Sequence, residues 1–126
     1  MSDFKLEHPF YISIVTALAM MKTLEFFSIS RLSVKWPNDI LSADKKICGI
    51  LIENVIKRND INASIIGIGL NVNQTEFENL PKASSLRVLS GKVYNLDELA
   101  ISIINNLKDY FLLLKEGNYT ILKAEY

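Results

Sequence analysis

Apolar residues recur at three- and four-residue steps over residues 9–27, the spacing that places side chains on one face of an α-helix. Further apolar residues lie between these positions, so the pattern predicts a helix from Pro9 to Phe27 that is mostly buried. The positions that carry the pattern are Ile12, Val15, Leu18, Ala19, Met21, Leu24 and Phe27. We expect this helix to pack under a sheet.

The next part of the chain changes to short runs with β-branched and alternating apolar residues, which predict strands. The predicted strands are 31–36, 40–41, 46–57 and 62–72. The predicted turns between them are Pro37–Asp39, Ser42–Lys45 and Lys57–Asp60, which contain residues that favour turns. Because a short polar turn separates the two long strands, we expect them to be antiparallel neighbours.

The last third of the chain predicts a surface connection followed by a helix. Residues 76–94 include Pro81, two serines and Gly91, so we expect a connection with a short turn around Ser84–Leu86. Asn95 can cap a helix, and Glu98 follows three residues later. That helix would carry Leu96, Leu99, Ile103, Leu107, Tyr110 and Leu114 on one face and end at Gly117. The order helix, strands, helix predicts an α+β fold with an antiparallel or mixed β-sheet flanked by helices.

Composition limits the classes of partner. The chain has 126 residues, of which 49% are hydrophobic and 22% charged, and this fits one domain over residues 1–126. Fourteen acidic and fourteen basic residues cancel, so no long-range field would attract nucleic acid or an anionic membrane. We therefore expect neither partner, and any anion must be recognised by a few placed groups.

The cysteine and histidine content limits the cellular compartment and the kinds of metal site further. Cys48 is the only cysteine, which excludes an intrachain disulfide and a cysteine-based zinc site and favours a reduced, cytoplasmic setting. His8 is the only histidine, so we predict no multi-histidine metal site. The acidic N-terminus lacks the order of a signal peptide, and the apolar run from Tyr11 to Met21 is well short of the roughly 20 residues that cross a bilayer.

Polar chemistry concentrates in Lys35-Trp36-Pro37-Asn38-Asp39, followed by Lys46 and then Gly49-Ile50-Leu51-Ile52-Glu53. A cation, amides, a carboxylate and bare backbone within one hairpin suit an anionic ligand. Without further context, Lys46 beside Lys45 is an ordinary solvated turn lysine. Asn38 and Asp39 are then ordinary turn residues that bond their own backbone.

A second motif, Gly67-Ile68-Gly69-Leu70-Asn71-Val72-Asn73, lies within the last predicted strand. Glycine inside a strand costs about 0.5–1 kcal/mol, so Gly49, Gly67 and Gly69 mark either bulges or the close approach of a ligand. A nicotinamide dinucleotide fingerprint is excluded, because position 72 is a valine and the following residues do not open a helix.

The two motifs, in this order, resemble those of the biotin protein ligase family, in which Lys-Trp-Pro-Asn-Asp precedes a Lys-x-x-Gly-Ile-Leu strand. The resemblance implies part of a class II synthetase-like catalytic domain. Such a domain makes biotinyl-5′-adenylate from biotin and ATP with Mg²⁺, then passes biotin to a lysine of biotin carboxyl carrier protein. A lipoate ligase is a further possibility within the same broad fold, but the motifs fit the biotin branch better.

The resemblance also implies roles for individual residues. Lys46 would contact the activated carboxylate and the α-phosphate, and Asp39 would orient Lys46. Asn38 and Asn71 would contact the nucleotide phosphates or the metal ion. The biotin pocket would consist of Gly49, Leu51, Gly67, Gly69 and Leu70. Glu53 is either a hydrogen-bonding support behind this pocket or a strand residue that faces solvent.

One family feature is absent from these residues. The Gly-Arg-Gly-Arg-Arg-Gly loop, which closes over biotin and the adenylate, is not present, since the first glycine is Gly49. We therefore expect residues 1–126 alone to have weak or no ligase activity. The alternative is a non-catalytic ligase-like module for binding or dimerisation, and an exposed sheet edge would favour a homodimer.

Overall fold

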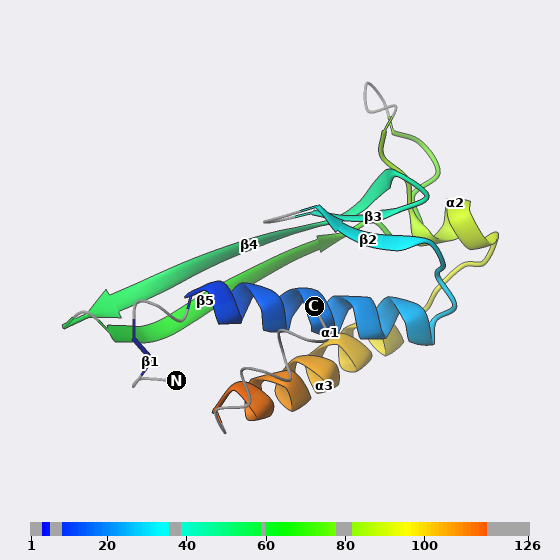
Figure 1. Cartoon of the computed structure of the whole chain (residues 1–126). Helices are drawn as coiled ribbons and strands as arrows, with labels where there is room; N and C mark the ends of the chain where they lie inside the picture. Colours follow the sequence, from blue (N-terminus) through cyan, green and yellow to red (C-terminus); the bar gives the residue numbers. More distant parts are fainter. Residues whose placement is uncertain (1–3, 6–8, 36–38, 59, 78–81, 116–126) are drawn as a thin grey trace.

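A computed structural model describes residues 4–5, 9–35, 39–58, 60–77 and 82–115 of the chain. The elements, in chain order, are β1 (Phe4–Lys5), α1 (Pro9–Phe26), β2 (Leu32–Lys35), β3 (Asp39–Ser42), β4 (Lys45–Lys57), β5 (Asp60–Leu70), α2 (Leu86–Ser90) and α3 (Leu96–Lys115). The long helices α1 and α3 lie together on one side of the β4–β5 ribbon (Figure 1).

The strands form one five-stranded sheet in the order β1-β5-β4-β3-β2, and each neighbouring pair is antiparallel. The predicted α+β fold with an antiparallel sheet is therefore confirmed. Two errors in the predicted bounds bear on the candidate site. Asp39 opens β3, where it pairs with Lys35 and Gly49, instead of lying in the turn. β5 ends at Leu70, so Asn71 lies beyond the strand.

The predicted first helix is confirmed as α1, and it is buried over most of its surface as expected. Strand side chains that alternate toward the helices contribute to the same core, including Ile50, which is 7% exposed. The intervening side chains behave differently, because Leu51 and Ile65 are each 61% exposed. The β4–β5 ribbon is thus covered by helices on one face and open on the other.

The helix caps explain where α2 and α3 begin. The Asn95 side-chain oxygen accepts the Glu98 backbone N–H at 3.0 Å, which confirms the predicted start of α3. Ser85 accepts the Val88 N–H in the same way at the start of α2. The predicted surface connection is partly wrong here, since Ser85 and Leu86 are fully buried and reach into the core.

Among the residues described, no helix combines the length and the apolar character that crossing a bilayer requires.

Candidate functional site

A β-bulge places Lys46 on the open face of the sheet. In the β3–β4 register, Leu41 pairs with Lys46 and Ile40 pairs with Cys48, so Ile47 is an extra residue. Ile47 and Cys48 are both buried, at 0% and 1% exposure, although regular alternation would send one of them outward. The bulge therefore brings Lys46 and Gly49, three positions apart, to the same side of the strand.

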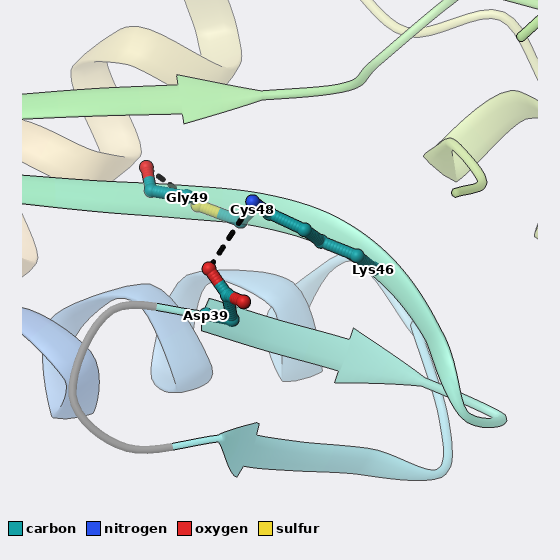
Figure 2. Close-up of polar contacts among 4 residues, drawn as sticks. All are labelled: Asp39, Lys46, Cys48 and Gly49. Atoms are coloured by element: carbon teal, nitrogen blue, oxygen red, sulfur yellow. Dashed lines mark hydrogen bonds and ion pairs between the residues drawn. The ribbon is translucent and has the colours of Figure 1, made fainter. Parts of the chain in front are cut away.

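The Lys46 ammonium group forms an ion pair with Asp39 across the β3–β4 pair. The Nζ atom lies 3.2 Å from Oδ1 of Asp39, and the two side chains are 50% and 29% exposed (Figure 2). An ion pair this exposed contributes at most about 1 kcal/mol to stability. Its main consequence is positional, because the carboxylate holds the cation over Gly49 while half of the lysine side chain stays accessible.

Three glycines form a patch of bare backbone beside this pair. Gly49 pairs with Gly69, and Gly67 pairs with Leu51, within an unbroken β4–β5 register from Cys48 to Val55. The alternative that these glycines mark bulges is therefore wrong. None has a positive φ, and a Cβ added at any of them would meet its neighbours at 3.5 Å or more. Neither backbone conformation nor crowding requires glycine at these positions, and the absence of side chains leaves the sheet surface open there.

The cation and the glycine patch line the same hollow, which has a volume of about 450 Å³. Its lining residues are Asp39, Lys46, Gly49, Ile50, Leu51, Gly67, Ile68 and Gly69. Of the predicted pocket residues, Leu70 is not brought here. It pairs with the buried Cys48 and packs against the core on the helix side of the sheet. Glu53 is exposed on β4 outside this hollow.

The asparagines of the two motifs fall in different places. The Asn71 amide nitrogen donates to the backbone oxygen of Ser84 at 3.1 Å, just beyond the end of β5. The Asn73 side chain bonds both backbone polar groups of Tyr94, which is a structural link. Asn38, Trp36 and Pro37 lie outside the described residues.

A segment that the sequence did not point to supports the backbone of Lys46. The Lys46 N–H donates to the oxygen of Lys82, and the Lys46 oxygen accepts the N–H of Ser84. Ala83 thereby forms a parallel bridge with Lys46. The polar and apolar pattern of residues 82–84 carries no signal for this pairing, which depends on where the loop after β5 returns.

The thiol of Cys48 lies beneath the site and is buried, next to the backbone of Gly49 (Figure 2). Burial raises the pKa of Cys48 to about 12; Lys46 lowers it and Asp39 raises it, both to a lesser extent. A thiol with so high a pKa stays protonated at neutral pH, so it is a packing group and not a nucleophile.

A cluster for a resident metal ion is not found within the described part of the chain, where no three histidine, cysteine or carboxylate side chains gather. Asp39 is the carboxylate that lines the hollow, and it is already paired with Lys46. The arrangement suits a small carboxylic acid whose charge meets Lys46 while its body lies on the glycine patch.

Comparison with known proteins gives consistent matches. Residues 3–71 match the model of the Biotin/lipoate A/B protein ligase family. The chain is 31% identical over 99 residues to the bifunctional ligase/repressor BirA of Escherichia coli (strain K12). The matched region makes up 77% of this chain and 31% of that protein. It is 38% identical over 72 residues to BirA of Bacillus subtilis (strain 168), and that match covers 57% of this chain and 22% of that protein.

Solved structures with a similar fold are biotin protein ligases. The enzyme from Aquifex aeolicus in complex with biotin and ATP gives a TM-score of 0.73 at 29% identity, covering 86% of this chain and 45% of that one. The enzyme from Leishmania major in complex with biotin gives a TM-score of 0.63 at 26% identity, and the match covers 84% of this chain and 48% of that one. The chain thus spans about half of these structures and less than a third of the two BirA proteins.

Proposed function

The chain belongs to the biotin/lipoate A/B protein ligase family, and on that premise we propose that its open sheet face binds biotin and ATP. The reaction is the activation of biotin to biotinyl-5′-AMP, followed by transfer of biotin to a carrier-protein lysine. The Aquifex aeolicus ligase, whose structure holds biotin and ATP, is a relative of similar fold and supports both substrates.

One observation carries the proposal: a fixed cation stands at the edge of a floor without side chains. Activation requires a biotin carboxylate oxygen to attack the α-phosphorus of ATP and expel pyrophosphate. The two reacting groups are anions and repel each other until positive charge offsets the repulsion. Lys46 supplies that charge at one end of the hollow, and Gly49, Gly67 and Gly69 leave room for the body of the substrate.

The remaining residues have supporting roles in this proposal. Asp39 holds the Lys46 ammonium over Gly49, and Leu51 forms an apolar wall. Asn38 and Asn71 would serve the nucleotide side. The amide nitrogen of Asn71 already donates to Ser84, and its oxygen has no hydrogen-bond partner within the described part of the chain, so we assign the oxygen to a ligand. That oxygen suits a cation or a water molecule better than a phosphate oxygen.

The donor set fits a Mg²⁺ ion that is held mostly by the nucleotide. Magnesium is commonly bound through one or two carboxylates together with substrate phosphates and water. Asp39 is the described carboxylate that lines the hollow, and its Oδ1 already faces Lys46, so the nucleotide phosphates would hold most of the ion. The ion would add positive charge at the phosphates, while this chain's own residues bind and orient the biotin carboxylate.

The second half of the reaction needs an acceptor lysine. The similar Paracoccus denitrificans protein is a biotin–[acetyl-CoA-carboxylase] ligase, 38% identical over 63 residues and covering 26% of that protein. We extend this acceptor class, a biotin carboxyl carrier protein, to the present chain. The amine of the acceptor attacks the acyl carbon of the adenylate, biotin forms an amide bond, and AMP leaves.

We further propose that residues 1–126 alone catalyse adenylation weakly. Lys46 is 50% exposed, so water screens its charge and the hollow does not exclude solvent. Biotin-dependent exchange of labelled pyrophosphate into ATP measures this step. Robust turnover by the 126-residue chain would contradict the proposed weakness.

A binding or dimerisation module is the second candidate, because apolar side chains continue along the open face beyond the hollow. Ile65 is 61% exposed and Val55 is 41% exposed on β5 and β4. Titration calorimetry with biotin and with biotin methyl ester separates the two candidates. Tighter binding of the free acid supports the ligase site, whereas no binding of either compound together with a concentration-dependent dimer supports the module.

A further inference from the structure

The neighbour of β4 changes at the residue that carries the ammonium group. β5 pairs with β4 as far as Cys48 and ends at Leu70. Beyond that point, residues 82–84 take its place and form a parallel bridge to Lys46. Both backbone polar groups of Lys46 are used: its N–H donates to Lys82 at 2.7 Å and its oxygen accepts from Ser84 at 2.9 Å.

Asn71 lies at this junction and joins its two sides. Its backbone N–H donates to the oxygen of Ile47 at 2.8 Å, and its side-chain amide donates to the oxygen of Ser84 at 3.1 Å. Ser84 in turn donates to Lys46. Together with the Lys46–Ile47 peptide bond, these hydrogen bonds close a ring through Asn71, Ser84, Lys46 and Ile47, the extra residue of the bulge.

The ring fixes the direction in which Lys46 points. Ile47 is the extra residue of the bulge, and the bulge turns the Lys46 side chain to the open face. Ser84 is 4% exposed, so its carbonyl group would have little access to water if the Asn71 amide were removed. The segment would then move to find another partner, and the backbone of Lys46 would move with it.

We propose that Asn71 is a positioning residue for Lys46, acting through Ser84, in addition to any contact with the nucleotide. The inference rests on the proposed function, since it concerns the same cation and the same carboxylate. The two ends of the Asn71 amide then have different roles: the nitrogen holds the bulge through Ser84, and the oxygen, which no described residue bonds, is the end for a ligand.

Biotin binding in the absence of ATP isolates the positioning role, because a contact with nucleotide is then irrelevant. Asn71→Ala should raise the dissociation constant for biotin at least about twofold, the lower end of the coupling between residues in one network. In a Lys46→Gln background the same substitution should have no further effect on biotin. Equal losses in both backgrounds would overturn the proposal, as would an unchanged constant in Asn71→Ala.

Asn73→Ala is the matched control. It removes two bonds between a side-chain amide and the backbone of Tyr94, two residues further along and away from Lys46. A purely structural loss should be similar in the two variants, so comparable thermal destabilisation is expected. Only Asn71→Ala should also weaken biotin binding, and equal weakening by Asn73→Ala would contradict the assigned role.

Amide hydrogen exchange without ligand tests the ring directly. The N–H groups of Lys46 and Ser84 should exchange several-fold faster in Asn71→Ala and at the wild-type rate in Asn73→Ala. Unchanged protection in Asn71→Ala overturns the positioning role even if biotin binds. If the wild-type chain binds no biotin, the proposed function fails, while the exchange rates still decide whether Asn71 holds the Lys46 backbone.

Discussion

The Nζ atom of Lys46 lies 3.5 Å from the point that a Cβ on Gly49 would occupy. Two residues three positions apart in a regular strand face opposite sides, so this proximity depends on the bulge at Ile47. The pattern of a lysine, two intervening residues and a glycine therefore corresponds to one local geometry. The ammonium group, on its flexible aliphatic chain, lies over a position that has no side chain.

Lys46→Met tests the cation while keeping the apolar stem. We expect the dissociation constant for biotin to rise about 10- to 100-fold, because a hydrogen bond to a charged group contributes about 1.5–3 kcal/mol. The free energy of unfolding should change by less than about 1 kcal/mol, since the ion pair with Asp39 is largely exposed. Titration calorimetry and chemical denaturation measure the two quantities.

Lys57→Met is the control for net charge, because Lys57 is an exposed lysine at the far end of the same strand. It should leave biotin affinity unchanged. Equal effects of the two substitutions would show that general charge, and not a placed ammonium group, attracts the ligand.

Gly67→Ala should stabilise the protein and weaken ligand binding together. An added Cβ would lie 3.6 Å from the backbone oxygen of Leu51, which is an ordinary contact. Alanine also has fewer conformations than glycine in the unfolded chain, which should raise the free energy of unfolding by about 0.5–1 kcal/mol. The same methyl group would occupy the floor of the hollow. Denaturant unfolding and biotin titration of one variant test both parts, and a variant that binds biotin normally would remove Gly67 from the site.

Gly91→Ala provides the contrast, because Gly91 ends α2 with φ of 76° and lies outside the hollow. Alanine is strained in that conformation, so stability should fall by about 1 kcal/mol without a change in biotin affinity. Opposite signs of the stability change at the two glycines would distinguish a glycine kept for ligand space from one kept for backbone conformation.

The sequence predicted elements with a clear period and missed those that depend on long-range pairing. The helix at residues 9–26 and the cap at Asn95 were found because helical spacing and capping chemistry are local. The alternation of side chains along a strand also predicts which residues share a face. Gly67 and Gly69 share one face, so Leu70 must lie on the other, although the resemblance placed all three in one pocket.

Two parts of the site could not be read from local pattern. The bulge at Ile47 leaves a weak trace, two adjacent apolar residues before Gly49, which any buried strand could also show. The pairing of Ala83 with Lys46 joins residues 37 positions apart along the chain. Such contacts are set by how the loop packs, and no period or propensity encodes them.

Cys48 should make stability fall at high pH. Burial raises its pKa from 9.0 to about 12, so above pH 9 the thiol ionises in the unfolded chain while the folded chain keeps its proton. The unfolded state then binds fewer protons, and the free energy of unfolding decreases with pH by up to about 1.4 kcal/mol per unit until about pH 12. Urea denaturation between pH 8 and about 11 measures the slope.

Cys48→Ala supplies the reference, because lysines and tyrosines also titrate in this range. The substitution should cost stability at pH 8 by opening a small cavity, and the deficit relative to wild type should shrink as pH rises. Parallel pH profiles of the two proteins would show that the Cys48 thiolate is not excluded from the folded state.

Thr23 and Asn106 join the two long helices across 83 positions of sequence, and this link should matter for stability but not for binding. The fully buried Thr23 hydroxyl donates to Ala19 within α1 and accepts the Asn106 amide from α3 at 2.8 Å. Thr23→Val keeps the shape and leaves the amide without that partner, which should cost about 1–3 kcal/mol. Thr16→Val is the matched control, since buried Thr16 makes the same bond within its helix, to Ile12, and has no hydrogen-bond partner on α3 among the described residues. Chemical denaturation should show a larger loss for Thr23→Val, and equal losses would mean that the link between the helices contributes nothing.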